Sequence, residues 1–175
     1  MELQFLYALQ ELHNQILDKI MIFLSSLGNA GIFWVCLGIL LLAIPKTRKC
    51  GGCMILSMAL TYVLGNLVLK NLVARPRPFT VAMDIVLKVT EPGEYSFPSG
   101  HTMNGFTAAT TLFFFYRGPG IAALILASAI AFSRMYLFVH YPTDILAGMV
   151  LGIVDAWMIF RLTSKKGCVT LNSNK

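Results

Sequence analysis

Five apolar segments, each of helical length, dominate the 175-residue chain and restrict the folds open to it. They occupy residues 27–44, 51–69, 102–116, 121–138 and 145–160. Because a bilayer core offers no water to unpaired backbone groups, such segments enter a membrane as helices. Several are shorter than the roughly 20 residues that cross the hydrocarbon core, so we expect neighbouring helices to enclose them. The sequence therefore predicts an all-α, polytopic membrane helix bundle with about five transmembrane helices.

Composition supports one membrane domain over residues 1–175. With 57% hydrophobic and 13% charged residues, the chain lies outside the range of ordinary soluble domains. Residues 1–26 mix Leu, Phe and Ile with Glu11, Asp18 and Lys19, a pattern typical of an amphipathic helix in the membrane interface. The alternative is that this segment forms a sixth span.

The distribution of basic residues predicts how the chain is oriented. Alternating the five spans across the membrane collects one group of basic residues on a side that has no acidic residue. The group consists of Lys46, Arg48, Lys49, Arg117, Arg161, Lys165, Lys166 and Lys175. Since cytoplasmic loops carry an excess of Lys and Arg, we expect this side, with the tail 164–175, to be cytoplasmic. We therefore attribute the net charge of +6 to contact with the lipid bilayer surface, and we expect no nucleic acid partner.

The one long connection, residues 75–98, falls on the extracytoplasmic side in this topology. Loops of this length in compact proteins are more often functional than idle. We interpret Lys88, Glu91 and Glu94 as solvated loop residues that shape substrate entry. For Arg75 two interpretations stay open, a contribution to an anion-binding field and a solvated loop cation.

Three polar clusters lie at the extracytoplasmic ends of the apolar segments: KNLVARPRP, PSGHT and SRMYLFVHYPTD. They supply three cations, Lys70, Arg77 and Arg134. A phosphoryl group in transfer spreads negative charge over three oxygens, so it needs several fixed donors around it. The planar forks of the two arginines suit phosphate oxygens. This inventory indicates phosphoryl transfer.

The PSGHT cluster adds a helix N-terminus. Ser99 is placed to begin the third apolar helix, which leaves the backbone N–H groups of Gly100 and His101 unpaired and aimed outward. Helix starts of this kind bind anions, and a glycine at position 100 lets the backbone approach a phosphate closely.

The two clustered histidines suit different tasks. His140 precedes Asp144 by four residues, so the carboxylate can hold one imidazole N–H and leave the other nitrogen to attack phosphorus. His101 is then the general acid that protonates the leaving oxygen.

Together the clusters form the pattern K, six residues, RP; then PSGH; then SR, five residues, H, three residues, D. This pattern resembles the signature of the type 2 phosphatidic acid phosphatase family, which includes vanadium haloperoxidases, and it extends over residues 70–144. The resemblance implies an all-helical membrane core, a phosphohistidine on His140, protonation of the leaving group by His101, and no metal or other cofactor. It places Lys70, Arg77, Ser99, Gly100 and Arg134 around the phosphate, with Asp144 supporting His140.

The resulting hypothesis is a membrane lipid phosphatase that acts on a phosphorylated lipid at the outer boundary of the bilayer. Resemblance to compact bacterial members favours undecaprenyl diphosphate as the substrate. Phosphatidic acid and phosphatidylglycerol phosphate are alternatives with the same chemistry. A vanadate-dependent haloperoxidase and a non-enzymatic anion transporter are alternatives from other classes. The membrane composition argues against the first, and the His–Asp pair beside a second histidine argues against the other.

Several polar residues lie outside these clusters. We interpret His13 as a hydrogen-bonded structural residue. Asp155 falls about three turns beyond Asp144 on nearly the same helix face, so we favour a buried, hydrogen-bonded acid over a catalytic one. The cysteines of the CGGC at residues 50–53 lack the further ligands that a zinc site needs, which favours a structural role.

The sequence spacing of several residues places them one helical turn apart, on the same face of a helix. Asn66 lies one turn before Lys70, and Asn104 lies one turn after His101, so both asparagines are candidates to support the site. The GxxxG formed by residues 148–152 favours close packing inside the bundle over dimerisation.

Overall fold

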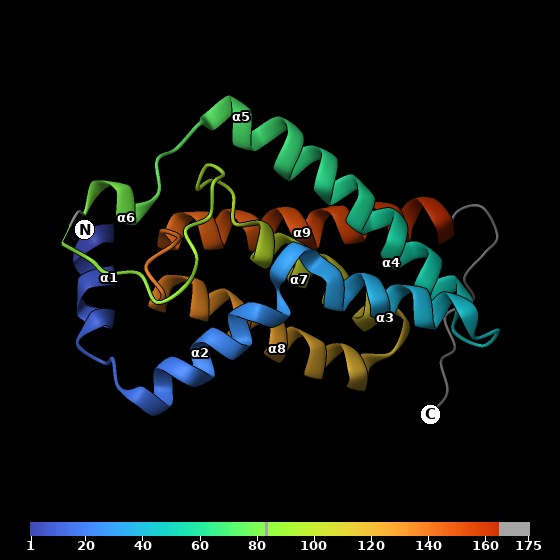
Figure 1. Cartoon of the computed structure of the whole chain (residues 1–175). Coiled ribbons are helices and arrows are strands. Elements are labelled where there is room, and N and C mark those ends of the chain that lie inside the picture. Colours follow the sequence, from blue (N-terminus) through green and yellow to red (C-terminus); the bar gives the residue numbers. More distant parts are fainter. Residues whose placement is uncertain (83, 165–175) are drawn as a thin grey trace.

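The computed structural model describes residues 1–82 and 84–164, which form helices and connecting loops without a strand. The longer helices are α1 (Glu2–Gln10), α2 (Gln15–Leu27), α3 (Ile32–Ala43), α4 (Arg48–Thr61), α7 (Gly100–Phe115), α8 (Arg117–Tyr136) and α9 (Pro142–Thr163). The shorter ones are η1 (Asn29–Gly31), the π-helical η2 (Tyr62–Leu69), α5 (Lys70–Val73) and α6 (Pro78–Val81). The predicted all-α architecture is confirmed (Figure 1). Most of the predicted tail, residues 165–175, lies outside the described residues.

Helix α7 forms the centre of the bundle, where it packs against α4, α8 and α9. Glycines let α9 approach it closely. A Cβ on Gly152 would come within 2.6 Å of the Met103 carbonyl oxygen, and one on Gly148 within 2.9 Å of the Ser99 carbonyl oxygen. The GxxxG of α9 therefore serves packing inside the bundle, as the sequence predicts.

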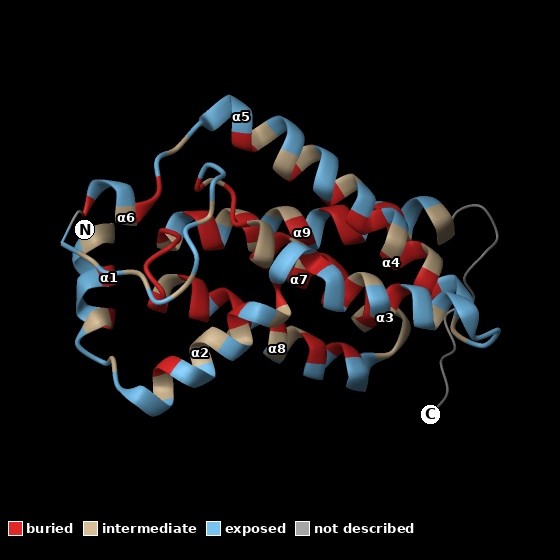
Figure 2. Ribbon diagram, viewed as in Figure 1, coloured by how far each residue is buried: buried red, intermediate tan, exposed pale blue. Residues whose placement is uncertain are grey.

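The outward faces of the helices are exposed (Figure 2), and many of the exposed residues are large and apolar. On α9, exposed hydrophobic residues recur at one-turn spacing, at Leu146, Val150, Ile153 and Trp157. A helix that buries polar groups and exposes an apolar stripe of this length is suited to contact lipid.

Three stretches among the described residues are long and apolar enough to cross a membrane: Arg48–Val81, α8 and α9. Helix α2 and the stretch Asn29–Ala43, bent by 43°, qualify together as a fourth. Helix α7 has 16 residues, fewer than the roughly 20 that a span needs, and its neighbours enclose it. A membrane helix bundle is confirmed. The sequence predicts about five spans; among the described residues, three stretches, or four with the bent pair, are able to cross a membrane by length and composition.

The N-terminal segment, predicted as one helix over residues 1–26, forms two helices. The break precedes α2, where the Asn14 side chain accepts hydrogen bonds from the backbone N–H groups of Ile16 (3.2 Å) and Leu17 (2.9 Å). An asparagine in this role is a favoured helix start. Two buried leucines of α1, Leu6 and Leu9, lie in one hydrophobic cluster with Phe138 and Tyr141, so α1 docks where α9 begins.

The connection between α2 and α3 is a sharp bend. Ala30 (φ 50°) and Gly31 (φ 68°) adopt left-handed backbone conformations there, which interrupts the helical hydrogen bonds. Gly28 precedes the bend and faces His101, since a Cβ at this position would come within 2.5 Å of the imidazole. The bend thereby brings α2 and η1 against the start of α7.

A polar cluster fixes α2 to the end of α8. The Tyr136 hydroxyl donates to Asp18 (2.7 Å), and Lys88 forms an ion pair with the same carboxylate. The His13 ring stacks on Tyr136, and its Nε2 lies 3.1 Å from the Tyr136 carbonyl oxygen, which confirms a structural role for His13. Lys88 is exposed, as predicted, and its ammonium also pairs with Asp18.

Asp155 lies buried in the bundle between α4, α7 and α9. Its carboxylate accepts a hydrogen bond from the Thr61 hydroxyl (3.0 Å), which also lies 2.8 Å from the Thr107 hydroxyl. The expected buried, hydrogen-bonded acid is confirmed. The CGGC cysteines, Cys50 and Cys53, are also buried, and the Cys53 sulfur lies 3.3 Å from the Thr163 hydroxyl.

The loop between α5 and α7 folds back on itself across the end of the bundle where α9 begins (Figure 1). It contains α6, and its two ends meet where the Ser96 N–H donates to the Arg75 carbonyl oxygen (2.9 Å). A cis peptide bond joins Phe97 to Pro98, immediately before the start of α7.

Candidate active site

Two helix N-termini meet at this end of the bundle, those of α7 and α9. The Ser99 N–H, just before α7, donates to the Asp144 carbonyl oxygen in the first turn of α9 (3.2 Å). The first N–H groups of α7 lack partners within the helix and can attract an anion. In α9, by contrast, Pro142 has no N–H and the Thr143 N–H already donates to Glu2. Ser99 itself is fully buried, and its hydroxyl accepts from Thr102 (3.0 Å).

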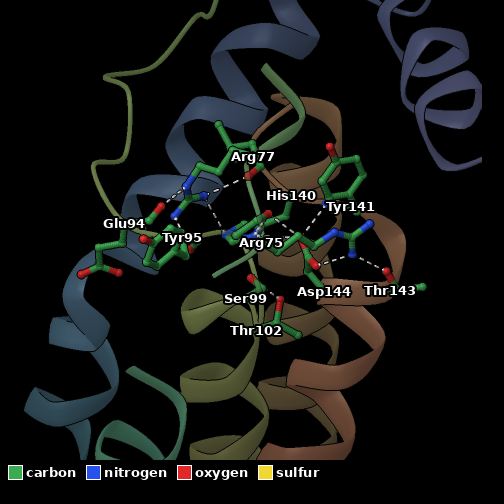
Figure 3. Close-up of polar contacts among 12 residues, drawn as sticks. Arg75, Arg77, Glu94, Tyr95, Ser99, Thr102, His140, Tyr141, Thr143 and Asp144 are labelled. Carbon is green, nitrogen blue, oxygen red and sulfur yellow. Dashed lines mark hydrogen bonds and ion pairs between the residues drawn. The ribbon is translucent and has the colours of Figure 1, made fainter. Parts of the chain in front are cut away.

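His140 lies between Arg77 and Asp144 (Figure 3). Its Nε2 is 3.2 Å from Nη1 of Arg77, and its Nδ1 is 3.5 Å from Oδ2 of Asp144. Arginine can only donate, so Nε2 accepts and the ring proton belongs on Nδ1, on the side of the carboxylate. The lone pair of Nε2 therefore faces the cationic side of the site.

His140 is uncharged in this setting. Burial lowers its pKa to about 3, and this outweighs the opposite effect of the hydrogen bond with Asp144. A neutral imidazole has a lone pair free to act as a nucleophile or base. The ring thus combines a fixed orientation with the reactive protonation state at neutral pH.

Asp144 has no exposed side-chain surface, and both of its oxygens are held. Oδ2 accepts from the Ser96 hydroxyl (2.5 Å) and the Tyr141 N–H (3.0 Å), and Oδ1 accepts from Arg75 (2.8 Å). Ser96 also lies 3.4 Å from Nδ1 of His140, so it touches both members of the His–Asp pair. Sequence reasoning missed Ser96, because a serine two residues before Pro98 carries no distinctive pattern.

Arg75 is held by contacts with several neighbours. Its guanidinium bonds Asp144, Thr143 (2.7 Å) and Glu2 (2.6 Å), and it lies 3.8 Å above the centre of the Tyr141 ring. It is therefore not a freely solvated cation. It also lines the cavity with Lys70 and Arg77, so a contribution to an anion-binding field stays a prediction.

Arg77 and Lys70 line a cavity of about 620 Å³. Arg77 is held by backbone carbonyl oxygens, with Nε donating to Glu94 (2.6 Å) and Nη1 to Val139 (2.9 Å). Lys70, whose side chain is 7% exposed, pairs with the Glu94 carboxylate, which is 66% exposed. The hydrogen bond from Lys70 lowers the pKa of Glu94. The Glu94 carboxylate, although well exposed as predicted, therefore pairs with Lys70, one of the residues expected to bind phosphate.

Gly100 lies close to this cation. A Cβ at position 100 would come within 4.0 Å of Nζ of Lys70 and 3.3 Å of the Asn66 side-chain oxygen. The absence of a side chain there keeps the start of α7 open toward Lys70. Asn66 touches the site, as expected, whereas Asn104 lies against Gly31 in the bend before α3.

His101 and Arg134 line a second cavity, of about 730 Å³. Nε2 of His101 is 3.1 Å from the Asn29 side-chain oxygen, and Arg134 donates through Nη1 to Ser25. Nε of Arg134 is buried and has no hydrogen-bond partner among the described residues.

The two cavities are neighbours, since Glu91 and Pro92 line both. Burial lowers the pKa of His101 to about 2, and the nearby cations Arg134, Arg77 and Lys70 act in the same direction. The predicted cations therefore gather at one end of the bundle, and the His101 ring is uncharged beside them. The sequence predicts that Lys70, Arg77 and Arg134 surround one phosphate. In the structure they border two neighbouring cavities, and Glu94 pairs with Lys70 in the first.

Among the described residues, no group of three or more His, Cys, Asp and Glu side chains is arranged to hold a metal ion. The site instead presents guanidinium, ammonium and helix N–H donors, which favour an anion with several oxygens. A helical membrane protein with this site belongs to the class of membrane phosphatases that act on phosphate esters or diphosphates, as the following relatives show.

Residues 51–168 match the family model of the PAP2 superfamily, which is more than half of the chain. An undecaprenyl-diphosphatase from Sulfolobus acidocaldarius is 36% identical over 151 residues, covering 85% of this chain and 71% of that protein. Undecaprenyl-diphosphatase BcrC from Bacillus subtilis is 30% identical, and the match covers 86% of this chain and 77% of BcrC. The crystal structure of a PAP2-type phosphatidylglycerolphosphate phosphatase from Bacillus subtilis superposes with a TM-score of 0.76 at 28% identity, covering 94% of this chain and 85% of that one. The chain belongs to the PAP2 superfamily.

Proposed function

We propose that this membrane phosphatase removes the terminal phosphate of undecaprenyl diphosphate through a phosphohistidine on His140. The observation that carries the proposal is the orientation of the neutral His140 ring, whose Nε2 faces Arg77 while Nδ1 faces Asp144. Nε2 attacks the terminal phosphorus, and the bond from phosphorus to the bridging oxygen breaks. His101 takes up a proton once the negative charge of the bound diphosphate raises its pKa, and the lipid phosphate leaves with that proton.

A second step completes hydrolysis. Water attacks the phosphorus of the phosphohistidine, the N–P bond breaks, and inorganic phosphate leaves. His101, deprotonated in the first step, takes the proton from that water and returns to its starting state. Asp144 stays ionised throughout and holds Nδ1–H of His140.

The phosphate oxygens are assigned to Lys70, Arg77, Arg134, the Ser99 hydroxyl and the backbone N–H groups at Gly100 and His101. Two features support this assignment: Nε of Arg134 has no hydrogen-bond partner among the described residues, and a helix start such as that of α7 leaves its first N–H groups unpaired within the helix. Lys70 can bind a phosphate oxygen once the Glu94 carboxylate moves away from it.

The substrate proposal rests on relatives named as undecaprenyl-diphosphatases that align with more than four fifths of this chain. The apolar outer faces of the helices suit a lipid whose tail stays in the bilayer. The structural neighbour that acts on phosphatidylglycerol phosphate makes that lipid the second candidate. Phosphatidic acid is the third, as another terminal phosphate on a membrane lipid.

A phosphate-release panel over these three lipids tests the proposal, with His140→Ala as the inactive control and a chelator present. We expect the highest kcat/KM for undecaprenyl diphosphate, no release by His140→Ala and no effect of the chelator. Faster turnover of either other lipid would reject the substrate, and turnover by His140→Ala would reject the nucleophile. Vanadate-supported halide oxidation without phosphate release would instead favour a haloperoxidase, and phosphate transport without hydrolysis would favour a transporter.

The site is proposed to face the extracytoplasmic side, with the C-terminus in the cytoplasm, on the strength of the basic residues near the ends of α3 and α9. A cysteine introduced at Thr90 in a variant without native cysteines should react with a membrane-impermeant maleimide added to intact cells. One introduced at Arg161 should react only after lysis, and the reverse pattern would overturn the topology.

A further inference from the structure

The carboxylate of Asp144 is completely buried and carries a charge that its surroundings must compensate. His140 is neutral and lies 3.5 Å away, so it offers a dipole and not a charge. The direct ionic partner is Arg75, with Nη1 at 2.8 Å from Oδ1. Arg75 is therefore the cation that directly offsets this charge, alongside the hydrogen bonds from His140, Ser96 and the Tyr141 N–H.

Arg75 governs both oxygens of this carboxylate. Its guanidinium binds Oδ1, while its backbone carbonyl accepts from the Ser96 N–H (2.9 Å). That contact positions Ser96, whose hydroxyl donates to Oδ2. One loop residue thus fixes the orientation of the carboxylate through two separate routes.

Arg75 is itself held rigidly. Its plane lies 3.8 Å from the centre of the Tyr141 ring, a cation–π contact, and Nη1 also donates to the Thr143 hydroxyl. Nη2 donates to Glu2 of α1 (2.6 Å). Since the planar guanidinium is bound along two edges, it has no freedom to rotate away from Asp144.

Glu2 does more than neutralise Arg75. Its other oxygen accepts from the Thr143 N–H (3.1 Å) and hydroxyl (2.7 Å), in the first turn of α9. It therefore supplies a partner for one of the N–H groups that α9 leaves unpaired, and a negative charge there is favourable. Buried Leu6 and Leu9 keep α1 in place for this contact.

We propose that Arg75, held by Glu2 from α1, is a positioning residue that orients Asp144 and through it presents Nε2 of His140 to phosphorus. This inference rests on the proposed nucleophilic role of His140. It gives the N-terminal helix a task in catalysis: α1 supplies the second carboxylate of a Glu2–Arg75–Asp144 chain. The proposal excludes Arg75 as a phosphate ligand, although Arg75 borders the cavity with Lys70 and Arg77.

The steady-state test compares Arg75→Gln, Arg75→Lys and Glu2→Gln with wild type. Substitutions of residues that orient a reactive group typically cost about 10- to 100-fold in activity. We expect a loss of about that size in kcat for Arg75→Gln, a smaller loss for Arg75→Lys and about threefold for Glu2→Gln, each with KM within about twofold of wild type. A raised KM with unchanged kcat would make Arg75 a phosphate ligand and overturn the proposal.

Tyr7→Phe is the matched control on α1. It removes the hydrogen bond from Tyr7 to Asp84 (2.7 Å) and leaves the start of α9 untouched. We expect wild-type kcat. An equal loss in Tyr7→Phe and Glu2→Gln would show that α1 acts only by docking, against the proposal.

Two readouts separate positioning from folding. Guanidinium added to Arg75→Gly should restore kcat in part, because the Arg75 side chain is 25% exposed and borders an open cavity. In the pH profile of kcat, the acid limb of Arg75→Gln should lie at higher pH, since His140 then faces a carboxylate without its cation. The other charges that act on His140, Arg77 and Arg134, are unchanged in this variant. No rescue and an unmoved acid limb would contradict the proposal.

The inference can be decided even if no lipid in the panel is hydrolysed. Nitrogen-15 NMR of labelled histidine in detergent reports which ring nitrogen carries the proton. We expect the Nδ1–H form of His140 in wild type and Tyr7→Phe, and a mixture with the Nε2–H form in Arg75→Gln. An unchanged tautomer in Arg75→Gln would reject the positioning role, whereas an inactive wild type would reject only the proposed function.

Discussion

Replacing Glu94 by glutamine is expected to lower KM for the lipid substrate and leave kcat unchanged. In the structure the Glu94 carboxylate pairs with Lys70, one of the cations assigned to the substrate phosphate. Both anions need the same ammonium group, so the enzyme binds substrate only in the fraction of molecules in which Glu94 has moved away. Glutamine has nearly the same shape but no charge, which removes the competition.

The magnitude follows from the exposure of the pair. Lys70 is 7% exposed but Glu94 is 66% exposed, so water screens the interaction and it is worth about 0.5–1 kcal/mol. That free energy corresponds to a paired-to-open ratio of about two to five. Because apparent affinity scales with the competent fraction, KM should fall about three- to sixfold in Glu94→Gln.

The assay is phosphate release at several substrate concentrations in detergent or liposomes at neutral pH. Lys70 lowers the pKa of Glu94, so the carboxylate stays ionised at neutral pH and the competition is lost only as pH falls through that lowered pKa. Glu91→Gln, in the same loop and bordering both cavities, is the control and should leave KM unchanged. A KM that stays the same or rises in Glu94→Gln would refute the reasoning and indicate that Glu94 assists the substrate.

Substitutions at three further positions test separate parts of the site and the bundle. Ser96→Ala removes the hydroxyl that contacts Asp144, so kcat should fall about tenfold at unchanged KM; a purely raised KM would contradict this. Gly28→Ala should lower kcat with little change in the melting temperature, since the new Cβ lies within 2.5 Å of the His101 ring. A wild-type kcat in this variant would mean that His101 is not the general acid. Asp155→Asn keeps an acceptor for the Thr61 hydroxyl and should retain wild-type kcat. Asp155→Leu removes that buried hydrogen bond and should lower the melting temperature. Loss of turnover in Asp155→Asn would assign Asp155 a catalytic charge.

The sequence predicts the parts of this protein that depend on local pattern. Apolar segments define the helices, and the fixed spacing of His140 and Asp144 brings an imidazole and a carboxylate together at the start of one helix. Gly100 and Ser99 mark a helix N-terminus for the same reason. These features need only the geometry of one or two adjacent turns.

The contacts that sequence reasoning missed are long-range. Glu2 and Thr143 are separated by 141 positions, and no local pattern relates α1 to the first turn of α9. Likewise Ser96 reaches Asp144 only because the two ends of the loop 75–98 meet. Charge counting placed Lys70 in the site but could not show that Glu94 folds back onto it, since Glu91 and Glu94 looked equally solvated in sequence.

The central claim, covalent phosphate on His140, is tested most directly by trapping the intermediate. Enzyme mixed with undecaprenyl diphosphate labelled in its terminal phosphate is quenched under alkaline conditions within the first turnover, digested and mapped by mass spectrometry. The account predicts a phosphoryl group on the peptide that contains His140, and none in His140→Ala. His101→Ala, in which hydrolysis of the intermediate is slowed, should accumulate more phosphohistidine when it is given a substrate with a good leaving group. Complete turnover with no label on His140, or label on another residue, would contradict it.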